Sequence, residues 1–375
     1  MVNNNTRKIT ALIKEKAGEI GFDLVGISTA EPFYAARKIL QERSLSEFIA
    51  NDIELLTTPD LHLAGVRSII ALALSYASSA VQMQHQEECY ISLYARGKDY
   101  HKVMAQKMVQ LSEFIQKIRP GAKVKAYSDT GALLDRAIAQ RAGLGWIGKN
   151  NNLINPTYGS YLFLGEILTD LELAADQEII DRCGDCELCL KSCPAGALID
   201  QYHLEAKHCI SYLTQQKGIL PEEDRKLIGR NLWGCDRCQQ VCPFNQGVPV
   251  DRHQQFKARL TGDIQKILSF FKGGIEPAWR DSALFWQGLR ILKRNSIINI
   301  VNSGNPDYIP LLSREINNPS PLIRAYVVWA LGELDYERNK TKLKALYQKE
   351  REGIVRAELA KIFAGKNKER SDDND

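Results

Sequence analysis

The chain has 375 residues, of which 44% are hydrophobic and 25% are charged. This is the composition of an ordinary globular protein with enough apolar material for two or three domains. The net charge of +4 is too small to identify a partner, no stretch is apolar for long enough to span a bilayer, and the N-terminus lacks the apolar core of a signal peptide. We therefore expect a cytoplasmic protein without a membrane partner.

The first 175 residues alternate between expected helices and strands. Residues 6–21 carry apolar residues at helical spacing and end in Gly, and residues 66–76 form an apolar run typical of a buried strand. The elements expected after these are a helix at 100–118, a strand at 123–129, a helix at 132–143 that ends in Gly, and two strands within 151–169 around a Pro-Thr-Tyr-Gly turn. This order predicts an α/β (α+β) domain over residues 1–175.

Eight of the nine cysteines lie between Cys183 and Cys242. A secreted disulfide framework would scatter its cysteines and follow a signal peptide, so a cluster of this kind indicates metal or redox chemistry. The remaining thiol, Cys89, has no second cysteine near it in sequence and is not expected to be a ligand. We assign residues 176–255 to a separate domain built around the cluster of cysteines.

The spacing of these cysteines is that of a ferredoxin with two 4Fe–4S clusters. Cys-x2-Cys-x2-Cys-x3-Cys-Pro is the bacterial ferredoxin run, whose fourth cysteine binds the other cluster, and a second run has the last three of these positions. Cys209 is the nearby cysteine that can replace the missing one. We therefore assign Cys183, Cys186, Cys189 and Cys242 to cluster one, and Cys193, Cys209, Cys235 and Cys238 to cluster two. Tetrahedral zinc is the alternative, because paired Cys-x2-Cys units also suit zinc.

Beyond about residue 280 the pattern becomes purely helical and repeats itself. Similar units begin at Arg294, Arg324 and Arg356, and the first two read as a helix, a break and a second helix. This resembles HEAT-like repeats, which offer an extended surface to a large partner; an unrelated helical bundle is the alternative. We assign residues 256–375 to this domain.

The C-terminal third is also the basic part of the molecule. Residues 251–375 hold 22 Lys and Arg against 16 Asp and Glu, a net +6, so the first 250 residues sum to about −2. Basic side chains give salt-dependent contacts to nucleic-acid phosphates, although each could equally be part of a solvated helix face. The candidates for phosphate contacts are Arg294, Lys340, Lys342, Lys344, Arg351, Arg356, Lys361 and Lys366.

Two other motifs are not in the expected context. Gly143-x-Gly145-x-x-Gly148 fits the dinucleotide fingerprint, but that fingerprint needs a strand before it and a helix after it, the reverse of what is expected here. Asp60-x-His62-x-x-Gly65 fits a motif that offers a histidine to cobalt in some cobalamin proteins. It should lie between a strand and a helix, but it directly precedes the expected strand at 66–76, so we interpret it as a surface turn.

Several separated stretches together resemble the epoxyqueuosine reductase family. They are ISLYARGKDYH (91–101), YSDTGALLDRAIAQRAGLGWIGKNNNLI (127–154), YGSYLFLGEI (158–167), KHCISYLTQQKG (207–218) and GCDRCQQVCPFN (234–245). They occur in the family's order and the likeness covers most of the chain, including the helical repeats. A more distant likeness to reductive dehalogenases covers only the α/β and cluster segments.

The resemblance implies a cobalamin-dependent oxidoreductase of tRNA modification. The family reduces the epoxide of epoxyqueuosine at the wobble position of tRNA, which is the last step of queuosine formation. Its cobalamin is base-off, without a histidine ligand, and is reduced through two 4Fe–4S clusters. The resemblance thus implies a cobalamin-binding catalytic domain over 1–175, a ferredoxin-like domain over 176–255 and tRNA-binding repeats over 256–375, in a monomer served by an external electron donor.

The resemblance also assigns roles to single residues. Asp129 matches the family's general acid, which protonates the departing oxygen; the alternatives are that Asp129 is a helix N-cap or that Asp135 is the acid instead. The positions that match cobalamin contacts are Ser92, Asp129, Leu153, Leu164 and Ser211, and Lys217 matches a tRNA contact. The family pattern is not followed around Leu55–Leu56, where relatives carry a basic residue towards the cofactor.

Two alternative functions are also compatible with the sequence. The first is a corrinoid iron–sulfur reductase of a small molecule, although such a substrate gives no reason for a basic helical repeat. The second is a ferredoxin-type electron carrier, although a carrier needs no α/β domain of this size and would not bind cobalamin.

Overall fold

The computed structural model describes residues 4–43, 47–48, 52–80, 89–129, 133–270 and 274–372, with side chains up to residue 365. The chain forms two compact units. The first comprises Met1–Val81, Gly97–Cys209 and Asp236–Ala258, and the second comprises Gln82–Arg96, Ile210–Cys235 and Arg259–Asp375. The segments Gln82–Arg96 and Ile210–Cys235 thus belong to the same unit as the C-terminal helices. The domain boundaries at residues 175 and 255 stay a prediction.

The core of the first unit is a four-stranded antiparallel sheet with the order β1-β2-β7-β4. Its strands are β1 (Leu24–Thr29), β2 (Ser68–Ser75), β7 (Leu162–Thr169) and β4 (Val124–Tyr127). Every residue of β2 is buried, since this strand lies between β1 and β7 and both its faces are covered. The strand predicted from the apolar run at 66–76 is therefore confirmed.

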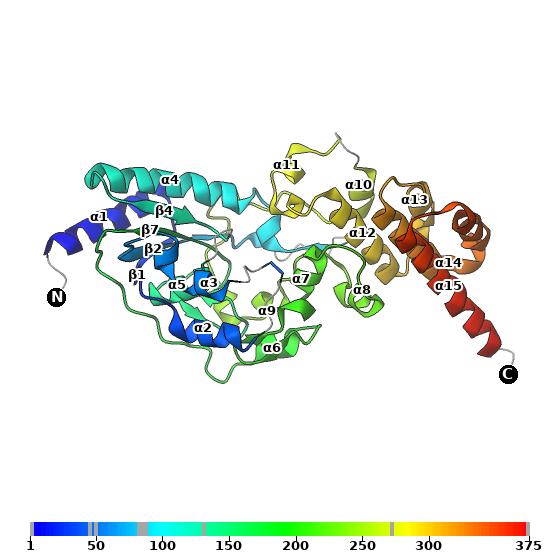
Figure 1. Cartoon of the computed structure of the whole chain (residues 1–375), viewed down its shortest axis with the longest axis horizontal. Helices are drawn as coiled ribbons and strands as arrows, with labels where there is room; N and C mark the ends of the chain where they lie inside the picture. The colour runs from blue at the N-terminus through cyan, green and yellow to red at the C-terminus, as the bar shows by residue number, and fades with distance from the viewer. Residues whose placement is uncertain are drawn as a thin grey trace. The chain divides into compact units, whose positions relative to one another are not determined.

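Helices cover both faces of this sheet (Figure 1). The helices α1 (Asn4–Ile20) and α4 (Tyr100–Ile118) contact each other, and α4 lies on β4 and β7. The helix α5 (Asp135–Arg141) contacts β1, β2 and β7. These helices were predicted, although α5 is shorter than expected.

Short elements complete the first unit. They are α2 (Tyr34–Gln41), α3 (Ile53–Thr57), η1 (Pro59–Leu61), β5 (Trp146–Ile147), β6 (Leu153–Ile154), α6 (Leu188–Ser192), β8 (Leu198–Asp200), β9 (His203–Leu204), η4 (Ala206–His208), α9 (Arg237–Gln240) and η5 (Pro243–Asn245). The strand β5 pairs with β6, and β8 pairs with β9.

The Gly-rich run at 143–148 and the motif around His62 have structural roles. The Gly-rich run leads from α5 into β5, and a Cβ at Gly145 would come within 2.2 Å of the Ile154 carbonyl oxygen, so glycine permits a close backbone approach there. His62 contacts the Tyr127 hydroxyl through Nδ1 and the Leu55 carbonyl through Nε2, both at 3.0 Å. Both ring nitrogens of His62 therefore have protein partners.

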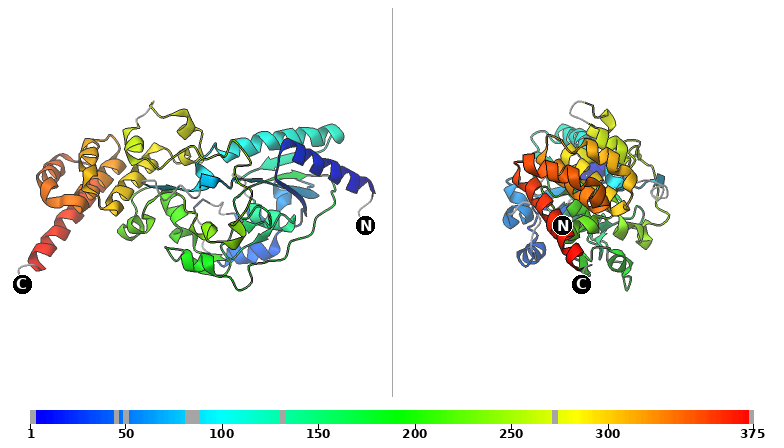
Figure 2. Two further views of the ribbon diagram at one scale, coloured as in Figure 1. Left: turned by 180° about the vertical axis from the view of Figure 1, so that it is seen from behind. Right: turned by 90° about the vertical axis from the view of Figure 1, so that its right-hand side faces the viewer.

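The second unit is mostly helical, as predicted for the C-terminal part of the chain (Figure 2). Its small sheet pairs β3 (Tyr90–Ile91) with β10 (Asn231–Trp233) in parallel. Its helices are η3 (Leu93–Ala95), α7 (Ile210–Gln215), α8 (Glu222–Ile228), α10 (Ile264–Ser269), α11 (Pro277–Arg280), η6 (Ala283–Phe285), α12 (Leu289–Ser303), η7 (Pro306–Tyr308), α13 (Ile309–Arg314), α14 (Pro321–Lys349) and α15 (Gly353–Asp372). The helix α14 is interrupted at Asp335, where φ is −163° and ψ is 84°, which gives the helix–break–helix unit expected there.

The arginines that open the first two helical repeats are structural. Arg294 is fully buried and donates to the carbonyl oxygens of Leu213 and Thr214 at the end of α7. Arg324 makes a bidentate ion pair with Glu350. The interpretation of Arg294 as a phosphate contact is therefore wrong, because its guanidinium is inaccessible to RNA. The side chain of Lys366, another candidate, lies outside the described residues.

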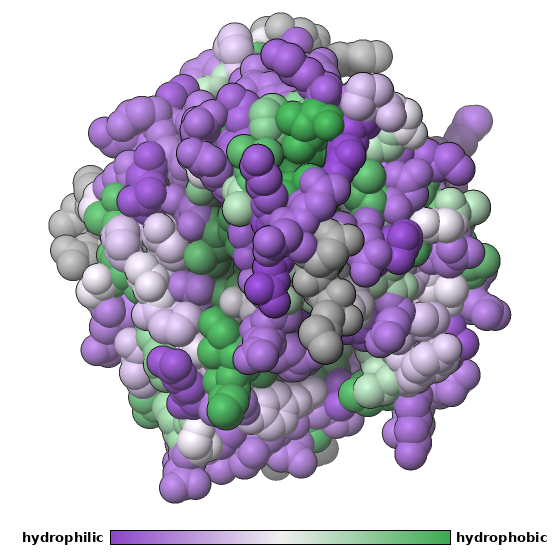
Figure 3. Space-filling view, turned by 90° about the vertical axis from the view of Figure 1, so that its left-hand side faces the viewer, coloured by the Kyte–Doolittle hydropathy of each residue, from purple (hydrophilic) through white to green (hydrophobic). Residues whose placement is uncertain are grey.

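On the face shown in Figure 3, apolar side chains form small patches separated by hydrophilic ones. Scattered exposed apolar residues are normal on globular proteins. Within the described residues, every helix is too short or too polar to span a membrane.

Candidate active site and cluster-binding segment

The first unit brings together the four cysteines assigned to cluster one. Cys183, Cys186 and Cys189 lie close enough to Cys242 for their charges to raise the pKa of its thiol, after burial, which raises it most. Cys183 and Cys242 also pack against Trp146, whose indole Nε1 lies 3.5 Å from the Cys183 sulfur. Cys242, remote in sequence, thus lies near the first run, and its assignment to cluster one stays a prediction.

The cysteines assigned to cluster two are divided between the two units. Cys193, Cys209 and Cys238 belong to the first unit and Cys235 to the second. None of the chain's nine cysteines, all within the described residues, is in a disulfide, so all eight clustered thiols keep the form that iron binding requires. No three described His, Cys, Asp or Glu side chains are grouped closely enough to ligate one ion, and a cubane does not need such a group because each thiolate binds a different iron.

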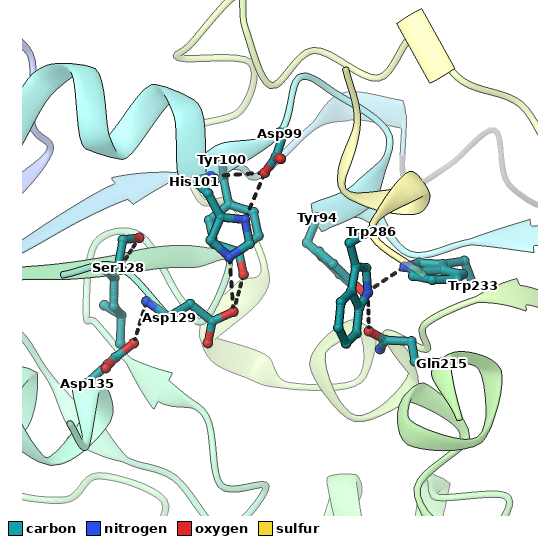
Figure 4. Close-up of polar contacts among 11 residues, drawn as sticks. Tyr94, Asp99, Tyr100, His101, Ser128, Asp129, Asp135, Gln215, Trp233 and Trp286 are labelled. Atoms are coloured by element: carbon teal, nitrogen blue, oxygen red, sulfur yellow. Dashed lines mark hydrogen bonds and ion pairs between the residues drawn. The ribbon is translucent and has the colours of Figure 1, made fainter. Parts of the chain in front are cut away.

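Asp129 lies just after β4, where the chain leaves the sheet. Its φ is +56°, and its side chain is 62% exposed. The Tyr100 hydroxyl donates to Asp129 Oδ2, and Nε2 of His101 lies 3.6 Å from the same oxygen (Figure 4). The N-cap of α5 is Leu134, so the alternative that Asp129 serves as a helix N-cap is wrong.

Tyr100 and His101 are held at the N-terminus of α4. Asp99 caps this helix by accepting from the His101 backbone N–H, and its Oδ1 lies 2.8 Å from His101 Nδ1. The Tyr100 ring stacks on Phe163, with centroids 4.2 Å apart. The cap and the stack together fix the direction in which both side chains point.

The charges of this group stabilise one another. Burial lowers the pKa of His101, but hydrogen bonds to Asp129 and Asp99 outweigh it and raise that pKa to about 9. Chiefly through the hydrogen bond from His101, the pKa of Asp129 lies below its ordinary value. At neutral pH the site therefore holds an imidazolium between two carboxylates, and the proton is on His101.

A second pair of carboxyl groups lies behind Asp129. Asp135 Oδ2 accepts from the backbone N–H of Asp129 at 3.2 Å, and the dense protein surroundings of Asp135, with the nearby Asp129 charge, raise its pKa to about 7. Glu166 on β7 is 1% exposed. Burial and Asp135 raise the pKa of Glu166 well above its ordinary value.

The residues predicted to contact cobalamin differ in accessibility. In the first unit, the Leu153 side chain is 3% exposed within the hydrophobic core, whereas Leu164 is partly exposed and its carbonyl oxygen accepts from Ser128. In the second unit, Ser92 is buried and Ser211 is partly exposed. Leu56, where the family pattern is not followed, is also buried.

The predicted tRNA contact, Lys217, is exposed just after α7. Nearby in the second unit, the exposed Trp286 donates from Nε1 to Gln215 at 3.0 Å, and Trp233 donates to the Tyr94 hydroxyl at 2.8 Å (Figure 4). These aromatic residues were not predicted as functional.

The sequence reasoning missed Tyr100, His101 and Glu166 as site residues. The Lys-Asp-Tyr-His run at the start of a predicted helix could have indicated Tyr100 and His101. Asp is a favoured N-cap residue, so the side chains that follow it lie at the N-terminal end of the helix. A single acid inside the apolar strand LFLGEILT was another, because a buried carboxyl group needs a specific reason.

Comparison with known proteins gives the family. The family model described as "Epoxyqueuosine reductase QueG, DUF1730" matches residues 57–130. The epoxyqueuosine reductase of Staphylococcus aureus is 36% identical over 92% of this chain and 94% of its own length. That of Bacillus subtilis is 35% identical over 95% of this chain and 96% of its own. The chain belongs to the epoxyqueuosine reductase family.

The other family models agree with the segments found in the sequence. A 4Fe–4S double cluster binding domain matches residues 182–245, which contain all eight clustered cysteines, and HEAT repeats match residues 289–362. The double-cluster prediction is therefore confirmed over zinc, and the repeat prediction is confirmed over an unrelated bundle.

Solved structures of epoxyqueuosine reductases share this fold. One, with an epoxyqueuosine-modified tRNA stem loop, aligns with a TM-score of 0.88 and 34% identity over 95% of this chain and 98% of its own. Another, from Bacillus subtilis and described as having its catalytic aspartate loop swung out of the active site, gives 0.89 at 34% identity over the same shares. A reductive dehalogenase aligns at a TM-score of only 0.43.

Proposed function

We propose that this chain reduces epoxyqueuosine to queuosine at the wobble position of tRNA, using cobalamin reduced through two 4Fe–4S clusters. The observation that carries the proposal is the match to epoxyqueuosine reductases along more than nine-tenths of the chain. The relative solved with an epoxyqueuosine-modified tRNA stem loop supports tRNA as the partner, with Lys217 as one contact. An external donor supplies the electrons, and the enzyme acts as a cytoplasmic monomer.

The thiols suit the clusters. Cluster one takes Cys183, Cys186, Cys189 and Cys242, which is supported by their mutual electrostatic effects. Cluster two takes Cys193, Cys209, Cys235 and Cys238, the four that remain in the matched domain. When bound, the clusters supply electrons one at a time.

For cobalamin, the fit rests on the accessible members of the predicted contact set. Asp129 and Leu164 leave atoms exposed in the first unit, and Ser211 does so in the second. Ser92 and Leu153 are buried, and their assignment as cobalamin contacts rests on the family resemblance alone. Both nitrogens of His62 have protein partners, which suits base-off cobalamin without this histidine as a ligand. When bound, cobalamin supplies the reducing equivalents at the substrate.

The protein's own residues supply the proton. Converting an epoxide to an alkene takes two electrons and two protons and releases the oxygen as water. The carboxyl group of Asp129 is 62% exposed, and His101 Nε2 holds a proton beside its Oδ2 at neutral pH. As the C–O bond breaks, the proton held on His101 Nε2 passes through the Asp129 carboxylate to the departing oxygen. The second proton, which completes the water molecule, comes from solvent. Tyr100 and Asp99 hold the two groups in place.

The proposal is tested in cells deleted for this gene, by mass spectrometry of nucleosides from bulk tRNA. Epoxyqueuosine should accumulate in the deletion and should become queuosine when the gene is restored. Restoration with an Asp129→Asn gene is the matched control and should leave epoxyqueuosine in place. Normal queuosine in a deletion strain without a redundant enzyme would overturn the proposal and favour a small-molecule reductase.

A further inference from the structure

Glu166 is a buried carboxyl group to which the proposed reaction has so far assigned no part. It lies on β7, 1% exposed, between β2 and β4 in the sheet. Its cross-strand neighbours are Ala71 and Tyr127. Within the described residues, its Oε1 receives no N–H or O–H hydrogen bond. An ionised carboxylate in such a place would bear a large desolvation cost.

The group that Glu166 does face is another carboxyl group. Asp135 begins α5, which packs against β7, and a hydrogen bond with the Asp135 carboxyl group is one of the causes that raise the pKa of Glu166. Two carboxylates cannot bond to each other without a proton between them, and a pair of this kind retains one. Glu166 is the more deeply buried partner, so the proton belongs on Glu166, which then donates to Asp135.

Asp135 in turn holds the backbone of the general acid. Its Oδ2 accepts from the Asp129 N–H at 3.2 Å (Figure 4). Asp129 has a φ of +56°, a conformation that costs a non-glycine residue free energy unless the surroundings impose it. A hydrogen bond to the backbone at this residue is one such constraint.

We propose that Glu166 is a positioning residue that stays protonated and donates to Asp135, so that Asp135 remains an acceptor for the backbone N–H of Asp129. This inference rests on the proposed function, in which Asp129 is the acid. In this arrangement, Glu166 holds Asp135 and Asp135 holds the backbone of Asp129. The three residues therefore form one chain of hydrogen bonds from the centre of the sheet to the site.

The surrounding charges agree with this protonation state. The titratable and charged groups near the pair are Asp129, Arg136 and Tyr127, the last being the cross-strand neighbour of Glu166. His101 lies on the far side of Asp129. The Asp129 charge favours a protonated pair, whereas Arg136 favours ionisation of Asp135. The result is one ionised acceptor beside one neutral donor, the arrangement that the Asp129 N–H requires.

The test compares Glu166→Gln with Glu166→Ala. Glutamine is neutral, nearly isosteric and still donates to Asp135, so its kcat on an epoxyqueuosine tRNA stem loop should stay within about threefold of wild type. Alanine removes the donor, so kcat should fall at least about tenfold while tRNA affinity and iron content stay unchanged. A glutamine variant as inactive as the alanine variant, or an alanine variant as active as wild type, would overturn the inference.

Infrared spectroscopy gives a readout independent of turnover. The wild-type enzyme at mildly alkaline pH should show the carbonyl band of a protonated carboxyl group, and Glu166→Gln should lack it. An unchanged band in the variant would overturn the assignment of the proton, even if the alanine protein does not fold. A wild-type enzyme that leaves the stem loop unmodified would instead count against the proposed function, so the two failures are distinguishable.

Discussion

His101 Nε2 lies 3.6 Å from Asp129 Oδ2, and on its other side His101 Nδ1 lies 2.8 Å from a carboxylate oxygen of Asp99. One imidazole therefore joins two acids at the start of α4. The pKa of His101, raised to about 9, keeps a proton beside Asp129 throughout the neutral range. Although the pKa of Asp129 is low, this residue can thus still transfer protons, because His101 donates a new proton to it each time.

His101→Gln should lower kcat by about 10²–10³-fold, since it removes the proton held beside Asp129. Wild-type kcat should decline as the pH rises through about 9, where the imidazolium loses its proton, and the variant should lack this decline. Any contribution of His101 to folding stability has the same sign: it is fully present below pH 6.5 and is lost as the pH rises through about 9. The measurement is a pH profile of stem-loop reduction, with His203→Gln as the control; an unaltered profile in the variant would contradict the role.

Asp129→Asn should abolish turnover while both clusters and cobalamin stay bound, because the amide cannot give up a proton to the departing oxygen. Iron analysis and the visible spectrum check the cofactors, and nucleoside mass spectrometry checks turnover. Asp170→Asn, a substitution just after the C-terminal end of β7, is the control and should behave as wild type. Near-normal turnover by Asp129→Asn would exclude it as the acid.

Cys209→Ala should reduce the iron content from about eight to about four atoms per chain, since each 4Fe–4S cluster needs its four thiolates. Cys89→Ala is the matched control and should retain all of them, because Cys89 lies outside the cluster domain. The comparison is made by iron analysis and electron paramagnetic resonance after anaerobic purification. Full iron in the Cys209 variant would show that another group completes cluster two.

Lys217→Ala should weaken tRNA binding and reduce the slope of log affinity against log salt by about 1, as expected for one lost phosphate contact. Lys226→Ala, at an exposed lysine of α8 in the same unit, is the control and should leave the slope unchanged. Stem-loop titrations at several salt concentrations make the comparison. Equal slopes for all three proteins would place the contact elsewhere.

Arg225 and Glu358 form a bidentate ion pair with both N–O distances 3.0 Å and side chains only 3% and 5% exposed. Glu358→Ala should destabilise the fold by about 3–5 kcal/mol, because it leaves a buried guanidinium unpaired. Lys361→Ala removes the exposed second partner of Glu358 and should cost less than about 1 kcal/mol. Denaturant unfolding measures both, and similar losses would contradict the buried-pair account.

Sequence patterns predicted the elements and the clusters well, because apolar periodicity and cysteine spacing are local. They failed where burial depends on tertiary packing. Arg294 reads as a surface cation on a helix, yet it is enclosed and caps the carbonyl oxygens at the end of α7. The sequence likewise gave no reason to pair His101 with Asp129 or Glu166 with Asp135, since each pair joins residues from different elements that only the folded sheet brings together.

The central claim is tested most directly with purified, anaerobically reconstituted enzyme, cobalamin, a chemical reductant and an epoxyqueuosine-containing tRNA stem loop, followed by mass spectrometry of the nucleosides. The account predicts queuosine from the wild-type enzyme and none from the Asp129→Asn variant with equal iron and cobalamin. Unchanged epoxyqueuosine with a wild-type enzyme that carries both clusters and cobalamin would contradict it.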